Sequence, residues 1–314
     1  MNAMNQDQWA RKAEQKQSQR SELVESLSQA ILFDGKSEPF KGLFLLRASS
    51  CAGAVHAVTE PSLCVIAQGV KEIFLGEERF QYDPYSYLLT TVELPVVARV
   101  LEASNDKPYL ALRLVLDPAI VSSVMMEVDL PSTRNQNDAK ALTVSPLDAA
   151  LLETVVRLVR VLSSAQEARV LLPLITREII YRLLVSDQGE RLRQMTVLGG
   201  HTHRIAKAIE RIRREFNQPL HIEELARDLG MSVSGFHHYF KAVTALSPLQ
   251  FQKQMRLQEA RRLMLGEDLD ATRAGFRVGY DNAAHFSREY KRLFGEPPLR
   301  DVGRLREAAT VNGE

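Results

Sequence analysis

The chain has 314 residues, of which 45% are hydrophobic and 25% charged, and its formal net charge is +1. This length predicts two domains of ordinary size, and the composition excludes a disordered or fibrous protein. The sequence lacks the run of about 18 apolar residues that a membrane span needs. Its polar first thirty residues also lack the apolar core of a signal peptide. We therefore expect a soluble, cytoplasmic protein.

Charge and histidine are unevenly distributed along the chain. Residues 201–300 contain 17 Lys and Arg, 12 Asp and Glu, and six of the seven histidines. A basic C-terminal part joined to a net acidic remainder indicates that the C-terminal part meets a polyanion. An unevenly charged surface is the alternative explanation.

The residue pattern of the N-terminal half changes from helical to β-prone along its length. A polar arm, residues 1–35, is expected to contain a helix near Glu22–Ile31. Turn-forming residues then separate short β-prone runs, at such close spacing that they predict an antiparallel sandwich or small barrel. These runs are Leu63–Ala67, Glu72–Leu75, Arg79–Tyr82, Tyr87–Thr91, Val96–Leu101 and Tyr109–Leu116.

Two apolar helices are expected after the strands. Ser145 as cap, with Pro146 in the first turn, predicts the start of the first. The second runs from about Leu172 to Leu184, with Pro173 in its first turn. Both helices either pack on the sheet or form a dimer interface. The Gly199-Gly200 pair suits a hinge in a linker at residues 187–203.

The C-terminal part predicts a helix-turn-helix unit. Ala226 lets two helices approach, and Gly230, four residues later, accepts a turn with positive φ. Ser232 is the expected cap of the next helix. The residues expected to face inward are Ile222, Leu225, Leu229, Val233, Phe236 and Phe240.

The same pattern recurs. Gly275 and Gly279 repeat the four-residue offset, and Asp281 is the expected cap of the following helix. A connecting helix between the two units has a predicted buried stripe of Leu249, Phe251, Met255, Leu257, Ala260 and Leu263. Two units held by one helix can enter successive major-groove faces about 34 Å apart.

These segments resemble a known family. SPLQFQKQMRLQEARRLML, VGYDNAAHFSREYKRLFGEPP and MSVSGFHHYFK are similar to signatures of the AraC/XylS family of bacterial transcription regulators. EPSLCVIAQGVKEIFLGEERFQYDPYSYLLTTVELPV resembles the N-terminal half of one branch of that family. The resemblance implies an α+β chain, with a cupin-like β-barrel and helical pair at 36–186. It also implies an all-α double helix-turn-helix domain at 204–300, followed by a tail at 301–314.

The resemblance also implies positions that contact DNA. The base-contacting positions would be Ser234, His237, His238, Asn282, Ala283, His285 and Arg288. The backbone-contacting positions would be Lys241, Lys291 and Arg292. Arginine reads guanine bidentately and asparagine reads adenine, and each such pair discriminates by about 1–3 kcal/mol. His238, Gly235, Gly275 and His221 depart from the residues usual in the family, which leaves the base specificity open.

The barrel is expected to bind a small-molecule effector. Cupin enzymes hold a metal with several histidines, but this half has only His56, so we expect no metal, no cofactor and no enzyme activity. The candidate pocket residues are His56, Tyr82, Tyr87 and Arg113. Arg113, between Leu112 and Leu114, alternatively faces solvent, and His56 alternatively serves only as a hydrogen-bonded barrel residue. Redox sensing by Cys51 or Cys64 is a further alternative.

These features together predict a bacterial, nucleoid-associated transcription regulator. Its expected partners are double-stranded promoter DNA, RNA polymerase, the effector and a second copy bound through helices 145–164 and 172–186. Motifs of nucleophilic catalysis and phosphate binding, such as GxSxG, HExxH and GxxxxGK[ST], do not occur. The alternatives are a cupin-type enzyme fused to a DNA-binding module, and an effector-free activator controlled by its abundance.

Overall fold

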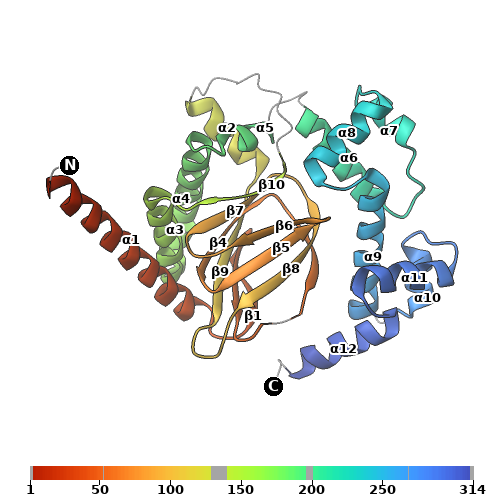
Figure 1. Ribbon diagram of the computed structural model, residues 1–314, viewed down its shortest axis with the longest axis horizontal. Helices are drawn as coiled ribbons and strands as arrows, with labels where there is room; N and C mark the ends of the chain where they lie inside the picture. Colours follow the sequence, from red (N-terminus) through yellow and green to blue (C-terminus); the bar gives the residue numbers. More distant parts are fainter. Residues whose placement is uncertain (1–2, 52, 129–139, 196–200, 268, 312–314) are drawn as a thin grey trace.

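The computed structural model describes residues 3–51, 53–128, 140–195, 201–267 and 269–311. Two antiparallel sheets lie in the middle of the molecule, with helices α1–α5 on one side and helices α6–α12 on the other (Figure 1). The predicted fold class is therefore confirmed: a β-rich N-terminal region with helices precedes an all-helical C-terminal region.

The described strands form two sheets, rather than one closed barrel. One sheet has the order β1-β2-β9-β4-β7-β10, and the other has the order β3-β8-β5-β6. The bounds are β1 Gly35–Phe40, β2 Leu43–Ala48, β3 Val55–Thr59, β4 Ser62–Gln68, β5 Val70–Leu75, β6 Glu78–Tyr82, β7 Ser86–Thr90, β8 Leu94–Glu102, β9 Tyr109–Val115 and β10 Leu142–Pro146. The six predicted strands are all present. The prediction missed β1, β2, β3 and β10, and of these β1, β3 and β10 are edge strands of their sheets.

The N-terminal helices differ from the predicted ones at their starts. Asp148, whose side chain accepts a hydrogen bond from the Leu151 amide, caps the first predicted helix, whereas Ser145 and Pro146 end β10. The second predicted helix begins before Leu172, because the Ser164 side chain caps it and leaves Pro173 inside the helix. The bounds are α1 Ala3–Ala30, α2 Pro118–Val128, α3 Ala149–Arg160, the 3-10 turn η1 Val161–Ser163, α4 Ala165–Val185 and α5 Gly189–Gln194.

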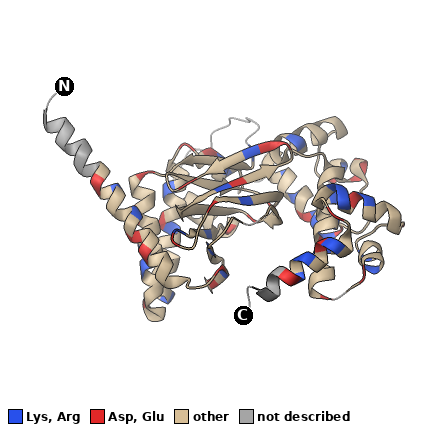
Figure 2. Ribbon diagram, turned by 60° about the horizontal axis from the view of Figure 1, so that its bottom comes forward, with Lys and Arg blue, Asp and Glu red and all other residues tan. Residues whose placement is uncertain are grey.

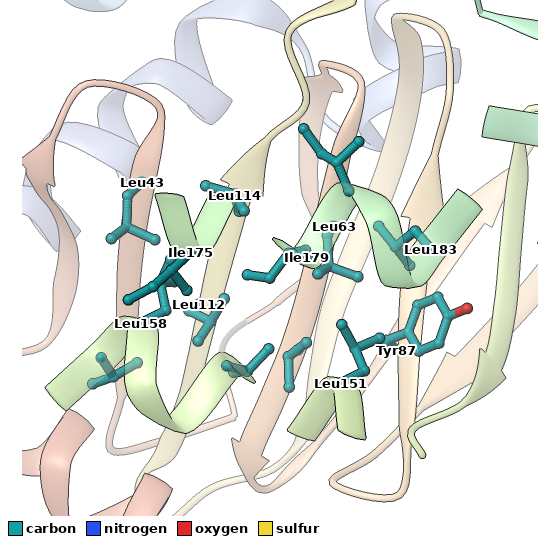
Figure 3. Packing of buried hydrophobic residues seen from close by; sticks show 14 of the residues in the cluster. Leu43, Leu63, Tyr87, Leu112, Leu114, Leu151, Leu158, Ile175, Ile179 and Leu183 are labelled. Atoms are coloured by element: carbon teal, nitrogen blue, oxygen red, sulfur yellow. The ribbon is translucent and has the colours of Figure 1, made fainter. Parts of the chain in front are cut away.

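Helices α1, α3 and α4 cover the outer face of the larger sheet. Alternate strand residues such as Leu63 and Leu112 point toward Leu151, Ile179 and their neighbours in a single buried cluster (Figure 3). This packing removes the apolar sides of the three helices from water, which is the main stabilising term for such an assembly. The opposite side of α4 exposes Val170, Leu174, Tyr181 and Val185.

A second cluster joins the sheets to the C-terminal helices. It contains Ile73 and Leu142 from the strands together with Phe240 and Leu246 from the helical region. The Ala141 amide donates a hydrogen bond of 3.2 Å to the Val243 carbonyl at this junction. Arg213 also forms an ion pair of 2.8 Å with Glu93. The expected hinge glycines, Gly199-Gly200, lie outside the described residues.

The C-terminal region consists of helices packed around α9, the connecting helix (Figure 1). Its helices pack in two buried hydrophobic clusters. One is shared with the sheets, and the other lies within the C-terminal region and includes Leu263, Val278, Phe286 and Tyr290. The bounds are α6 His201–Arg214, α7 Ile222–Asp228, α8 Val233–Thr244, α9 Pro248–Gly266, α10 Ala271–Arg277, α11 Ala283–Phe294 and α12 Pro298–Val311.

Candidate nucleic-acid interface

The first helix-turn-helix unit consists of α7 and α8. Gly230 has a φ of 64° at the turn, a left-handed conformation that glycine adopts without steric cost. Ser232 caps α8 by accepting a hydrogen bond of 3.1 Å from the Gly235 amide, as predicted. Phe236 and Phe240 are fully buried, whereas Val233 is 39% exposed, so its predicted inward position was wrong. His221 precedes α7 without a side-chain capping bond.

The second unit consists of α10 and α11. At its turn, Gly279 has a φ of 91°, and a Cβ there would lie 2.2 Å from the Asn217 carbonyl oxygen. A Cβ on Gly275 would lie 2.9 Å from Cγ of buried Phe286, so glycine lets that ring pack directly against α10. The cap of α11 is Asn282, whose Oδ1 accepts a hydrogen bond of 2.9 Å from the His285 amide. The predicted cap, Asp281, was therefore wrong by one residue.

Helix α9 holds the two units together through polar contacts as well as its apolar stripe. The Arg256 guanidinium donates to the Phe216 carbonyl at 2.6 Å and to the Gly279 carbonyl at 2.8 Å. Gln252 donates to the same loop, at the Gln218 carbonyl. These bonds tie the turn of the second unit to the loop before the first, so the two units are held in one fixed arrangement.

The apolar stripe of α9 is close to the predicted one. Phe251, Met255, Leu257, Ala260 and Leu263 are buried, but Leu249 is 57% exposed and does not belong to it.

A buried carboxylate fixes α11 against its neighbours. Asp301 of α12 is fully buried and accepts hydrogen bonds from the Tyr290 hydroxyl at 2.8 Å and from Arg261 at 2.7 Å. Arg304 donates to the same carboxylate. Burial, together with the bond to Asp301, raises the pKa of Tyr290 above its usual value, so its hydroxyl stays a donor. The sequence analysis did not identify Asp301, because its partners lie on three different helices.

The structure exposes most of the predicted DNA-contacting residues. On α8, on α11 and at the cap of α11, the exposed members are Ser234, His237, His238, Lys241, Asn282, His285, Arg288, Lys291 and Arg292. Ala283 is half-buried. Helices α8 and α11 lie toward opposite ends of α9 (Figure 1).

Some basic side chains of α8 and α11, the recognition helices of the two units, form no ion pair with any described residue. Basic and acidic positions are interspersed over the C-terminal helices (Figure 2), and many of them form ion pairs, such as Arg211 with Asp228 at 2.6 Å. Arg292 pairs with Glu289 at 2.7 Å. Among the described residues, Arg288, Lys241 and Lys291 have no carboxylate partner within ion-pair distance, so their charges are available to a ligand.

Lys241 and Arg292 also line a groove between α8 and α11 on the side of the sheets. The turn between β5 and β6 contributes Gly76, Glu77 and Glu78 to the same groove. Gly76 lies so close to Leu246 that a Cβ added to the glycine would be 3.3 Å from the leucine side chain. Two of the predicted backbone contacts therefore share a groove with acidic residues of the N-terminal region.

The four predicted effector residues lie in three places. Tyr82 and Arg113 are on the faces of the two sheets that look toward each other. Tyr87 lies on the outer face, among Leu151 and Leu183 of the helices (Figure 3). His56 lies on the outer face of the smaller sheet, with its ring 4.7 Å from that of Phe294. The structure thus brings together only Tyr82 and Arg113.

In the described part of the chain, no group of three or more His, Cys, Asp or Glu side chains is arranged to hold a metal ion. None of the described helices has the length and apolar character required to cross a membrane.

Two family models match the chain. The model of the AraC-type transcriptional regulator N-terminus matches residues 39–191, and that of a helix-turn-helix domain matches residues 225–301. Both matches agree with the regions in which the structure shows the sheets and the paired helix-turn-helix units.

Curated relatives are similar over part of their length. The transcriptional activator RhaS of Klebsiella pneumoniae is 29% identical over 134 residues, which is 42% of this chain and 47% of RhaS. The thermoregulatory protein LcrF of Yersinia pestis is 25% identical over 180 residues, which is 57% of this chain and 65% of LcrF. The chain spans about half the length of the curated relatives it matches.

Solved structures of ToxT from Vibrio cholerae share the fold. A ToxT variant without ligand superposes with a TM-score of 0.55 at 10% identity, over 83% of this chain and 97% of that one. Wild-type ToxT with a bound unsaturated fatty acid gives a TM-score of 0.53 at 10% identity, over 83% and 93% of the two chains. With both family models and the whole fold in agreement, the chain belongs to the AraC family of transcription regulators.

Proposed function

We propose that this protein is a sequence-specific, DNA-binding transcription regulator rather than an enzyme. The observation that carries the proposal is the pair of helix-turn-helix units fixed on α9 by Arg256 and Gln252, each presenting an exposed second helix. Such an arrangement suits two adjacent major-groove segments on one face of a DNA duplex. In this proposal residues 204–300 are the DNA-binding domain, residues 36–186 the sensor and residues 187–203 the linker.

The residues take two roles. We assign base contacts to Ser234, His237, His238, Asn282, Ala283, His285 and Arg288, and backbone contacts to Lys241, Lys291 and Arg292. Arg288 is the strongest of these, because it is exposed and free of carboxylate partners among the described residues. Asn282 uses its side-chain oxygen for the helix cap, which leaves its amide nitrogen as the group able to contact DNA.

The sensor is proposed to bind a small-molecule effector. Support comes from the open pair of facing sheets, and from the shared fold of ToxT, one structure of which holds an unsaturated fatty acid. In the proposed mechanism the effector changes how the sensor sits against the DNA-binding domain, and thereby contact with RNA polymerase. The protein would act in the cytoplasm, on the nucleoid.

A second copy of the chain is the proposed partner of α4. Its outer side carries Val170, Leu174, Tyr181 and Val185, spaced by four, seven and four residues along the helix. This spacing places the four side chains in an apolar stripe on one side of α4, which Arg177 interrupts between Leu174 and Tyr181. Apolar stripes of this kind become buried in helix–helix dimers. The stripe belongs to the helical pair for which the sequence left two roles open, packing on the sheet and forming a dimer interface.

A footprint on self-selected DNA tests the function. Genomic fragments enriched by the purified protein are expected to share a site with two protected boxes one helical turn apart, each with major-groove contacts. Affinity for these fragments should exceed that for random DNA of equal length by at least about a thousandfold. Equal affinity for all fragments at both low and physiological salt would contradict sequence-specific regulation. The same measurement on isolated half-sites shows whether both units read DNA.

A further inference from the structure

Two basic side chains occupy positions between the sheets where alternation favours apolar residues. Lys71 lies on the same side of β5 as Ile73 and Leu75, which pack in the cluster between the sheets. Arg113 lies on the same side of β9 as Tyr109 and Ala111, which belong to that cluster. The two faces meet, because the Lys71 Nζ lies 5.8 Å from the centroid of the Tyr109 ring.

Several side chains on these facing sides keep surface that solvent can reach. On the outer face of the same strands, Leu63 and Leu112 are completely buried. On the inner face, Cys64, Lys71 and Arg113 keep accessible surface. Protein nevertheless surrounds Cys64 and Lys71 almost completely. Apolar inner-face residues that also keep accessible surface are Leu46, Phe80, Ala98 and Val100. We call the region that these residues border the intersheet space.

The intersheet space has an excess of positive charge. Arg113 stacks on the Phe44 ring at 4.5 Å and reaches Glu60 at 3.7 Å, a carboxylate that is half exposed. Lys71 has no carboxylate partner among the described residues. Burial, together with the nearby Arg113 charge, lowers the pKa of Lys71. Glu60 is thus the one carboxylate among the described residues that pairs with either Lys71 or Arg113, and one positive charge stays uncompensated in a region with little water. Such a charge favours binding of an anion.

Polar groups beside Lys71 complete the site. Tyr82 is the direct cross-strand partner of Lys71. The Tyr82 hydroxyl lies near that of Tyr109 on the opposite sheet. Both hydroxyls are buried, and burial raises the pKa of each above its usual value, so both remain able to donate a hydrogen bond. The cations, the hydroxyls and the apolar wall together match a molecule with one acidic end and an apolar body.

We infer that the intersheet space binds a monocarboxylate, with its carboxylate between Lys71 and Arg113 and its apolar body against Leu46, Phe80, Ala98 and Val100. One negative charge neutralises the excess of one positive charge, and arginine and lysine are both suited to carboxylate recognition. This inference rests on the effector role proposed for the sensor and gives the effector's chemical class.

The Cys64 thiol reports on this site without any knowledge of the ligand. Cys64 is the register partner of Arg113, and the chain has only two cysteines, so Cys51→Ser leaves Cys64 as the only thiol. The rates of its reaction with anionic sulfonatoethyl methanethiosulfonate and with cationic trimethylammonioethyl methanethiosulfonate are compared with those of free cysteine. We expect the anionic-to-cationic rate ratio to exceed that of free cysteine by about tenfold or more, because an enclosed positive region concentrates anions.

Matched variants locate the charge. Lys71→Met and Arg113→Met are each expected to remove most of this preference, whereas Lys107→Met, at an exposed loop position, leaves it unchanged. A ratio equal to that of free cysteine, or one indifferent to Lys71→Met, overturns the inference. So does a Cys64 thiol that reacts with neither reagent, because the space would then be closed.

The ligand class is tested by protection of Cys64. Decanoate is expected to slow the modification of Cys64, while decanol and decylamine at equal concentration do so at least about tenfold less effectively. Lys71→Met should abolish the difference between decanoate and decanol. Equal protection by all three would show an apolar cavity without anion recognition. Because no DNA is present, failure here leaves the DNA-binding proposal intact, and failure of the footprint leaves this site intact.

Discussion

At the scale of single residues, substitution of Arg288 tests whether the protein recognises DNA bases directly. It lies on the exposed side of α11, and a bidentate arginine–guanine contact contributes about 1–3 kcal/mol of discrimination. We expect Arg288→Ala to weaken binding to the selected site by about 10- to 100-fold and binding to random DNA by much less. Equilibrium titrations on both DNAs at one salt concentration measure this.

The matched control is Arg300→Ala, which removes an exposed arginine from α12 without touching a recognition helix. If both variants lose the same affinity on both DNAs, Arg288 contributes charge and not base recognition.

His56 gives the contact between the sheets and the C-terminal helices a dependence on pH. Burial and the charge of Arg261 lower the pKa of His56 to about 4, and the charge of Asp301 opposes them only in part. A histidine with a lowered pKa takes up a proton more readily once it is released to water. When β3 separates from α11, His56 takes up as much as one proton at pH values between about 4 and the ordinary histidine pKa of 6.5. The contact between β3 and α11 therefore weakens as the pH falls through this range.

Hydrogen exchange of β3 amides between pH 7 and pH 5, corrected for intrinsic rates, is expected to show this loss of protection. His56→Gln, which keeps a polar side chain but does not titrate, should remove most of the pH dependence. An unchanged dependence in the variant would place its origin in other groups.

At the scale of elements, the sequence predicted the structure where periodicity and turn chemistry agree. The paired glycines at 230 and 279 indicated both turns, and the two recognition helices followed from them. The prediction was poorer for the residues at which helices begin, because neighbouring elements determine those boundaries. The cap of α11 is Asn282 and not Asp281, and α3 starts after Asp148 because β10 pairs with β7 through Ser145 and Pro146.

The candidate site was predictable to a similar degree. The DNA-contacting positions came from the resemblance to the AraC/XylS family, and the structure adds that most of them are exposed. The intersheet site is different: Lys71 comes directly before the predicted β-prone run Glu72–Leu75, and only the second sheet makes it an interior cation. Tyr87 and Arg113 illustrate the same point, because their side of the sheet depends on where α3 and α4 pack.

Helix α4 carries the test of dimerisation. Leu174 is 58% exposed in the middle of its outer stripe, so Leu174→Glu adds a charge there without disturbing the core. If the stripe joins two copies, this variant is expected to be monomeric at concentrations where the unaltered protein is dimeric, as measured by light scattering. Gln166→Glu, at an exposed polar position of the same helix, serves as control. A monomeric unaltered protein would contradict the proposed interface.

At the scale of the whole molecule, the cluster shared by sheets and helices links the stability of the two regions. Leu246 is 5% exposed and packs beside Gly76, and Phe240 and Phe251 continue the cluster into the first helix-turn-helix unit. We expect the sheets and the first unit to unfold in one calorimetric transition. Leu246→Ala, which leaves a cavity at the junction, should cost about 2–5 kcal/mol and split that transition.

Leu299→Ala is the control, because Leu299 is 72% exposed on α12. Separate transitions for the sheets and the first unit in the unaltered protein would show that the shared cluster does not couple them.

The shared cluster also bears on how such a chain can be recombined. The first helix-turn-helix unit borrows part of its core from the sheets, whereas the second is built around its own cluster of Leu263, Val278, Phe286 and Tyr290. A chimaera that exchanges the second unit with that of a relative, cut within α9, keeps both cores whole. Exchange of the first unit alone divides a core, so new DNA specificities are more readily acquired by shuffling at the C-terminal end of the protein.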